Sequence, residues 1–180
     1  MSKKSLVAIA LVVIMATCCS MVCALDYTPP ATGTKLRITN STNTDRVLNV
    51  STWGTPAQGD NVTIWSWSNN GTQWWKTEYY AQIGGVGAYM VPLYDYPTLM
   101  LNYHQADYTC TIYGTSGNYY TDYTIYWDKL DTYNFHLYLY SYNRFLGIPN
   151  DNLGAQCIWY YLTNGATDQE KWIVTIPPQS

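Results

Sequence analysis

The chain carries little charge of either sign, and basic residues are the scarcer kind. Its 180 residues include 9 Lys plus Arg against 12 Asp plus Glu, which gives a net charge of −3. Proteins that bind nucleic acid or anionic membranes need a positive stripe or patch, and no such cluster occurs here. The composition therefore argues against a nucleic-acid partner and against an anionic membrane as partner.

Histidine is also scarce, and the residue types that carry catalysis or bind cofactors form no recognisable motif. Neither His104 nor His136 belongs to a Ser, His and acid set with familiar local context. His104 lies near Asp107 and Cys110, but this spacing matches no metal template. The glycine-rich run over residues 84–87 lacks the lysine and the helical pattern of a phosphate-binding loop. We therefore expect no enzyme activity, no metal and no cofactor.

Long apolar runs are absent except at the N-terminus. Two lysines near the start precede an apolar stretch over residues 6–19, and the small residues Val22 and Ala24 follow it. This order is typical of a secretory signal peptide cleaved after Ala24. We expect residues 1–24 to be removed and the protein to be secreted, with no integral membrane segment left after removal of the signal.

Beyond the predicted signal peptide, the cysteines are Cys110 and Cys157. An even number in an oxidising compartment is compatible with one disulfide. In the repeat alignment given below, however, Cys110 matches Val62 whereas Cys157 matches Thr63. A one-residue offset on a strand turns the two side chains toward opposite faces. The sequence therefore leaves the disulfide open.

The aromatic residues are abundant and unusual in kind. The chain has 19 Tyr and 8 Trp but only 2 Phe. A buried tyrosine must find a partner for its hydroxyl, so a core alone does not favour Tyr so strongly over Phe. Amphipathic rings suit half-wet surfaces such as sugar-binding faces and protein interfaces, although Tyr is also a good strand residue.

Three ordered blocks recur along the chain at nearly constant spacing. Each copy has an apolar strand, a second strand ending in an aromatic residue, and a tryptophan about 25 residues after the first strand. Runs rich in Val, Ile, Thr, Tyr and Trp alternate with turn residues, and no capped amphipathic helix is visible. The blocks are 46–50, 62–65 and 73–75; 99–103, 110–113 and 125–127; and 144–148, 156–159 and 170–172.

The repeats predict an all-β domain of three similar units, with about four strands in each unit and about twelve in total. Twelve short strands must close on themselves to cover their apolar faces and edges. We expect the first and last strands of each unit to form a barrel and the middle hairpins to cap it. An extended lead-in over 25–34 precedes a domain over 35–180, with repeats at about 35–84, 87–131 and 134–177. Inward positions are Leu48, Leu101 and Leu146, with Trp75, Trp127 and Trp172 around the axis.

These blocks resemble the ricin-type β-trefoil lectin family, also known for its Gln-x-Trp repeat. The resemblance covers residues 35–177 and is clearest in the first repeat. There the strand ending in Trp65 follows Gly59, and Gln73 stands two residues before Trp75. The second repeat keeps only the tryptophan, and Gln169 of the third is one position out of step. The resemblance implies a β-trefoil fold and shallow sugar sites.

In that family each sugar site combines an acidic residue, an aromatic platform and amide groups before the signature tryptophan. The resemblance places the first site at Asn49, Thr63, Trp65, Thr72 and Gln73. Trp65 would stack on the apolar face of a pyranose, while Asn49 and Gln73 would bond its hydroxyls. Asn49 replaces the aspartate usual in the family, and an amide bonds less strongly than a carboxylate.

The other two repeats retain less of the site. Asn102 and Tyr113 occupy the matching places in the second repeat, but Ile125 replaces the glutamine. In the third repeat Gly147 replaces the polar partner, and Trp159 remains alone. We expect a weaker second site and a structural third repeat.

The leading hypothesis is a secreted lectin-like protein that recognises glycans by aromatic stacking and hydrogen bonds. One alternative is the cell-binding subunit of a multi-chain toxin or adhesin, which would add a protein partner subunit. Another is a secreted trefoil that binds no sugar and acts as an inhibitor or a structural protein. Fold alone does not choose among these.

Overall fold

The structure of the protein is a computed structural model. It describes residues 29–116, 119–161 and 167–177. The predicted signal peptide and the first part of the lead-in lie outside the described residues. Within these ranges the chain forms twelve short strands and three 3-10 helices, and no helix is long and apolar enough to cross a membrane.

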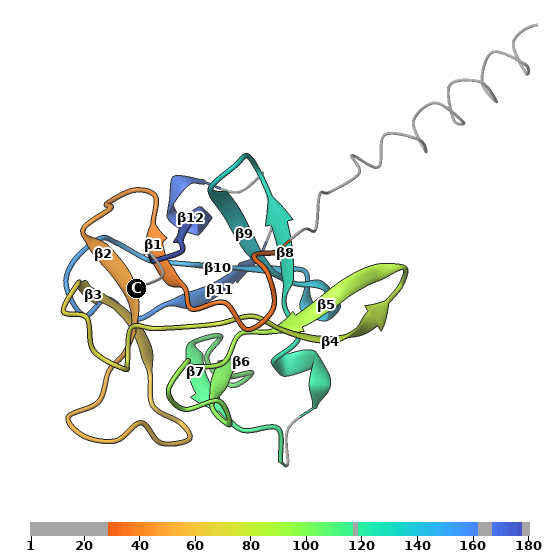
Figure 1. Cartoon of the computed structure of the whole chain (residues 1–180), viewed down its shortest axis with the longest axis horizontal. Helices are drawn as coiled ribbons and strands as arrows, with labels where there is room; N and C mark the ends of the chain where they lie inside the picture. Colours follow the sequence, from red (N-terminus) through yellow and green to blue (C-terminus); the bar gives the residue numbers. More distant parts are fainter. Residues whose placement is uncertain (1–28, 117–118, 162–166, 178–180) are drawn as a thin grey trace, which may run out of the picture.

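The strands are short and follow one another with few interruptions (Figure 1). They are β1 (Arg37–Asn40), β2 (Arg46–Val50), β3 (Val62–Ser66), β4 (Glu78–Ile83), β5 (Val86–Met90), β6 (Met100–Tyr103), β7 (Cys110–Tyr113), β8 (Tyr126–Lys129), β9 (Asn134–Leu139), β10 (Arg144–Gly147), β11 (Ile158–Tyr161) and β12 (Trp172–Thr175). The 3-10 helices are η1 (Tyr120–Asp122), η2 (Tyr140–Tyr142) and η3 (Asp168–Glu170).

The pairing of the strands shows three units of four. The middle strands of each unit form antiparallel hairpins, namely β2–β3, β6–β7 and β10–β11. First and last strands of neighbouring units pair as β1–β12, β9–β8 and β4–β5, and β9 and β12 pair within the third unit. Isolated bridges from Trp75 to Leu36 and to Leu93, and from Tyr89 to Ile125, link the remaining edges. The predicted barrel with its three hairpins is therefore confirmed.

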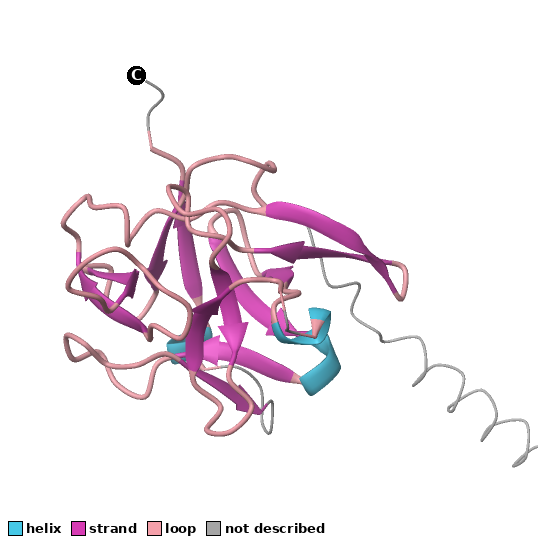
Figure 2. Ribbon diagram, turned by 90° about the horizontal axis from the view of Figure 1, so that it is seen from below, coloured by secondary structure: helices cyan, strands magenta, loops and turns pink. Residues whose placement is uncertain are grey.

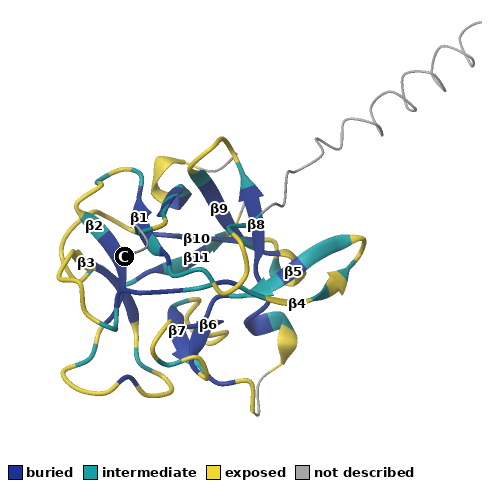
Figure 3. Cartoon of the chain, in the orientation of Figure 1, coloured by how far each residue is buried: buried dark blue, intermediate teal, exposed yellow. Residues whose placement is uncertain are grey.

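The β4–β5 hairpin differs from the other strand pairs because it extends beyond the body of the molecule (Figures 1 and 2). Three of the six β4 residues, Tyr79, Tyr80 and Gln82, are exposed, whereas most residues of β2 and β9 are buried (Figure 3). The shift of register between Tyr79 and Ala81 is the kind of bulge that bends and twists a strand.

The core lies where the repeat predicted it. The three repeated leucines and the three repeated tryptophans are all fully buried, at Leu48, Leu101, Leu146, Trp75, Trp127 and Trp172. The indole of Trp75 donates to the Leu48 carbonyl at 3.0 Å, and Trp172 donates to Leu146 at 2.8 Å. Trp127 of the second unit has no hydrogen-bond partner for its buried indole nitrogen among the described residues. The three units thus share their packing but not all of their polar contacts.

The two described cysteines are free thiols and are fully buried. The backbone nitrogen of Cys110 donates to the carbonyl of Cys157 at 2.8 Å, so the two residues are neighbours in the same core. The argument from sequence that they face opposite sides is therefore wrong. It assumed a one-residue offset, with Cys157 in the place of Thr63. The strand registers put Ile158 in that place, so Cys157 is equivalent to Val62 and to Cys110 and shares their inward face.

The thiols of Cys110 and Cys157 are expected to be unreactive in the folded protein. Burial raises the pKa of both thiols well above the ordinary value, and alkylation requires the thiolate. Iodoacetamide followed by peptide mass mapping should find neither residue labelled under native conditions and both labelled in guanidinium without reductant. Labelling that appears only after reduction would show that they form a disulfide.

Candidate functional site

A pocket of about 210 Å³ lies beside the β2–β3 hairpin, on the surface of the first unit. Its lining includes three of the five residues that the sequence placed in the first site: Asn49, Trp65 and Thr72. Thr63 and Gln73 are buried and do not line it. Ser68 and Asn70 line it as well, and sequence reasoning missed both because they belong to a loop without a recognisable pattern. The remaining lining residues are Val50, Ser51, Thr52 and Trp53.

Trp65 lies near the end of β3, where successive side chains alternate between core and solvent. Ile64 points into the core, so Trp65 points outward and 45% of its surface is exposed. Gly154 of the third unit backs the ring: a Cβ built on Gly154 would lie 3.1 Å from Cζ3 of Trp65, and its φ is +80°. The nitrogen of Gly154 donates to the Ile64 carbonyl at 2.9 Å, which holds this support in place.

The polar group of the pocket is the pair formed by Asn49 and Thr72. The Thr72 hydroxyl lies 2.9 Å from Oδ1 of Asn49 and 2.5 Å from Oδ1 of Asn70. A hydroxyl has one proton, so it can donate to only one of these two oxygens at a time. The Nδ2 group of Asn49 donates to the Val50 carbonyl at 3.0 Å. This bond fixes the amide and leaves Oδ1 with capacity to accept a proton from a ligand.

Gln73 is fully buried, and the neighbouring loop uses both ends of its amide. Its Oε1 accepts from the nitrogen of Ser68 at 2.8 Å and from the Ser68 hydroxyl at 3.1 Å. Its Nε2 donates to the Ser66 carbonyl at 2.8 Å. Gln73 therefore shapes the loop that carries the pocket-lining residues, and its amide is turned away from the pocket itself.

Thr63 is buried opposite Asn49 on the paired strand, and Nδ2 of Asn49 lies 3.5 Å from its hydroxyl. The second unit repeats this arrangement: Asn102 is buried opposite Thr111, with the same 3.5 Å contact. Tyr113, in the place of Trp65, is half-buried. The second unit therefore keeps the asparagine and threonine pair but offers less exposed ring.

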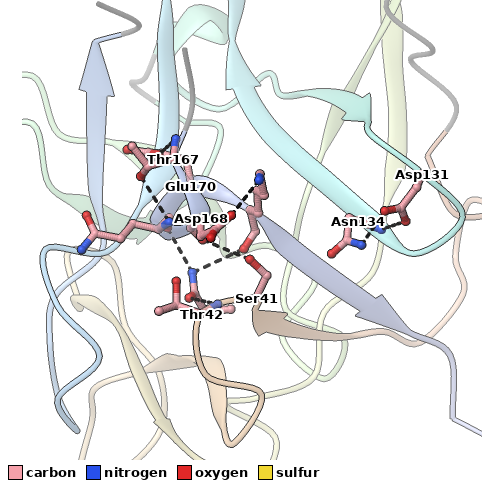
Figure 4. A network of polar contacts seen from close by, with 10 residues as sticks. Ser41, Thr42, Asp131, Asn134, Thr167, Asp168 and Glu170 are labelled. Atoms are coloured by element: carbon pink, nitrogen blue, oxygen red, sulfur yellow. Dashed lines mark hydrogen bonds and ion pairs between the residues drawn. The ribbon is translucent and has the colours of Figure 1, made fainter. Parts of the chain in front are cut away.

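In the third unit the Glu170 side chain lies against Gly147, and Figure 4 shows the polar contacts around Glu170. Glu170 accepts hydrogen bonds from the Thr167 backbone and hydroxyl, which forms a capping box at the start of η3. A Cβ on Gly147 would lie only 2.9 Å from Cγ of Glu170. Glycine at this position thus permits the close approach, and the Ser41 hydroxyl closes the group by bonding the Asp168 carbonyl at 3.0 Å.

Trp159, which the sequence alignment placed at the aromatic position of the third unit, is not available to a ligand either. Trp159 is fully buried, and its indole donates to the Asn102 carbonyl at 3.4 Å. The strand registers show why: Trp159 lies opposite Leu146, as Ile64 lies opposite Leu48, so it holds an inward position. Tyr160 takes the place of Trp65 and Tyr113 in the third unit, and it is half-buried. Of the three units, the first presents the most ring surface.

The histidines of the described residues make local pairs. His104 lies 2.8 Å from Asp107 in an exposed loop, and hydrogen bonds from Thr109 and then from His104 lower the pKa of Asp107 to about 2. His136 pairs with Asp128 at 3.0 Å in a buried position. Within the described ranges, no three or more His, Cys, Asp or Glu side chains gather so that they could hold a metal ion.

No protein-family model matches the chain, and no curated protein matches it in sequence. Solved structures do match in fold. A designed threefold-symmetric protein, ThreeFoil, gives a TM-score of 0.62 at 20% identity, covering 78% of this chain and 96% of the other.

Two natural lectins also match in fold. A ricin B-like lectin of Macrolepiota procera, solved with lactose, gives a TM-score of 0.61 at 14% identity, covering 83% of this chain and 100% of the other. The C-half of an earthworm R-type lectin, solved with GalNAc, gives 0.57 at 15% identity, covering 80% and 99%. Identities this low speak for the fold alone. The chain has the β-trefoil fold that these lectins share.

Proposed function

We propose that the protein binds neutral glycans, without catalysis, in the pocket formed by Asn49, Trp65 and Thr72. One observation carries this proposal: an exposed indole ring lies in the same pocket as an amide oxygen with free acceptor capacity. A pyranose has an apolar face that stacks on such a ring and hydroxyls that need aligned partners. Small-molecule sites combine apolar walls with few polar groups in this way.

Each residue of the pocket has a separate role in binding the sugar. Trp65 provides the platform, and Oδ1 of Asn49 accepts a hydroxyl proton from the sugar. Thr72 switches its own proton to Asn70, which leaves its oxygen and that of Asn49 to the ligand. Gln73 acts through the loop that it holds. The lactose and GalNAc bound by the two matching lectins are uncharged saccharides, which supports the choice of a neutral ligand.

The wider proposal includes secretion, because the N-terminal sequence has the pattern of a signal peptide. A pocket of about 210 Å³ is small for a ligand site and holds about one sugar ring. Affinity of a single site of this kind is low, and strong attachment to a cell surface would come from several copies acting together.

A screen of the full chain on an array of neutral glycans, followed by titration calorimetry on the tightest binder, tests this function. Asn49→Ala should weaken binding about 2- to 10-fold, because one hydrogen bond contributes about 0.5–1.5 kcal/mol. The matched control is Asn102→Ala, which makes the same change at the equivalent place in the second unit and should leave affinity unchanged.

Two results would contradict the proposal in different ways. Absence of binding to every glycan on the array would remove the lectin function itself. Loss of affinity in Asn102→Ala but not in Asn49→Ala would keep the function and transfer the site to the second unit.

A further inference from the structure

A second pocket, of about 300 Å³, is lined in part by the same loop as the first. Residues 65–74 contribute to both: Trp65 lines the first pocket, whereas Trp67 and Trp74 line the second. The second pocket shares no lining residue with the first. Its lining consists of Arg37, Trp67, Asn69, Trp74, Thr175 and Pro177.

Two cations without a negative partner among the described residues lie over the tryptophans of this pocket, and one of them, Arg37, also lines it. Lys35 and Arg37 flank the inward-facing Leu36, so they share the outer face of the chain at β1. The guanidinium carbon of Arg37 lies 5.3 Å from the ring centroid of Trp67, and Nζ of Lys35 lies 4.4 Å from that of Trp74. Within the described part of the chain, neither cation forms an ion pair, whereas Lys76 and Lys171 both do.

The Nε atom of Arg37 is buried and has no hydrogen-bond partner among the described residues. A buried donor without a partner costs about 1–3 kcal/mol, so such groups in a folded protein call for an explanation. Nε itself is closed off from the pocket, so an anion bound there would offset this cost through the charge of the guanidinium group and would bond its terminal nitrogens. Arginine bonds carboxylate and sulfate oxygens with two parallel hydrogen bonds, which suits this role.

The walls of the pocket are rigid and aromatic. The rings of Trp67 and Trp74 meet edge to face, with centroids 4.7 Å apart and planes at 88°. The Trp74 indole donates to Oδ1 of Asn69 at 3.0 Å, which fixes one ring. Trp67 retains 36% exposure, so part of its surface remains free for contact with a ligand.

We infer that this second pocket binds an acidic saccharide, with Arg37 holding the carboxylate or sulfate group and Trp67 contacting the sugar ring. The two unpaired cations select an anion, and the indole surface selects a ligand with an apolar face. The volume is at the lower end for small-molecule sites, so it suits one sugar ring better than an extended acidic peptide.

The experiment uses the full chain carrying Trp65→Ala, so that the first pocket does not contribute. Titrations with lactose, 3′-sialyllactose and 3′-sulfolactose compare the same neutral core with a carboxylate and with a sulfate. We expect one or both acidic ligands to bind at least about tenfold more tightly than lactose, since a charge-assisted hydrogen bond is roughly twice as strong as a neutral one. The sialylated and sulfated ligands distinguish the two sources of the charge.

Arg37→Gln should abolish the preference for acidic ligands. Arg46→Gln is the matched control, since it removes the same charge from β2, where Arg46 bonds the Asp151 carbonyl away from this pocket. Trp67→Ala is the second variant: its partly exposed ring can be removed without opening the core, and it should weaken the acidic ligands about tenfold.

The inference is overturned if lactose and both acidic ligands bind equally, or if Arg37→Gln and Trp67→Ala leave the preference intact. It is also overturned if a hexaglutamate peptide binds through Arg37 while the acidic saccharides do not. Failure of the neutral-glycan function would appear instead in the protein with Trp65 intact, so the two proposals fail separately.

Discussion

Replacing Trp75 with alanine is expected to lower the free energy of unfolding by about 3–5 kcal/mol. The indole is fully buried at the centre of the core, where it also donates to the Leu48 carbonyl. Truncation leaves a cavity. It also removes the indole N–H, which is the only side-chain donor to the Leu48 carbonyl among the described residues. A domain of this size is stable by about 5–15 kcal/mol, so the loss is a large fraction of the total. Guanidinium unfolding followed by circular dichroism measures it.

Phenylalanine at the same position separates packing from hydrogen bonding. Trp75→Phe keeps an aromatic ring but deprives Leu48 of its donor, which adds about 1–3 kcal/mol to the cost of the smaller ring. Trp127→Phe is the matched control, because the indole nitrogen of Trp127 has no described partner to lose. Trp127→Phe should therefore be the milder change. Equal losses in the two variants would contradict the difference between the first and second units.

The core could be predicted from the sequence because the fold repeats it. A residue near a threefold axis meets the same environment three times, so the leucine and tryptophan positions recur at constant spacing. Substitutions elsewhere, such as Ile125 in the place of the glutamine, do not change the spacing of these leucines and tryptophans. The predictions that Leu48 and Trp75 lie inside are confirmed, since both are fully buried.

The surface could be predicted less well, because its environment differs between units. The sequence alignment matched Trp159 with Trp65, yet the register of β10 and β11 puts Trp159 in the inward place of Ile64, where it is buried and bonds the Asn102 carbonyl. A shift of one residue in the alignment is enough to exchange an outward strand position for an inward one. One signal was available: Gly147 stands where the other units have asparagine, and a glycine there allows Glu170 to approach.

The second pocket was missed for a related reason. Its residues come from β1, from the loop before β4 and from the end of β12, so no local motif links them. The alternation of Lys35 and Arg37 with buried Leu36 does predict two cations on one outer face. Only the fold brings Trp67 and Trp74 beneath them.

Replacing Trp65 with alanine is expected to weaken binding of the tightest neutral glycan by about 30-fold or more. Truncating a central aromatic anchor costs about 2 kcal/mol or more, and about 1.4 kcal/mol corresponds to a tenfold change. The stability of the protein should change little, because 45% of the ring is exposed and its supporting contact is Gly154, which has no side chain. Calorimetric titration measures the affinity, and thermal unfolding checks the fold.

Trp67→Ala is the control for this change, because it removes a tryptophan of similar exposure from the neighbouring pocket. It should leave neutral-glycan affinity within about twofold of the original value. Mutations at sites that share no partners act nearly independently, and Trp67 does not line the first pocket. Unchanged binding in Trp65→Ala would show that the exposed indole is not the platform. The site would then belong to the second unit, where Asn102 keeps its threonine partner and Tyr113 is the remaining ring beside it.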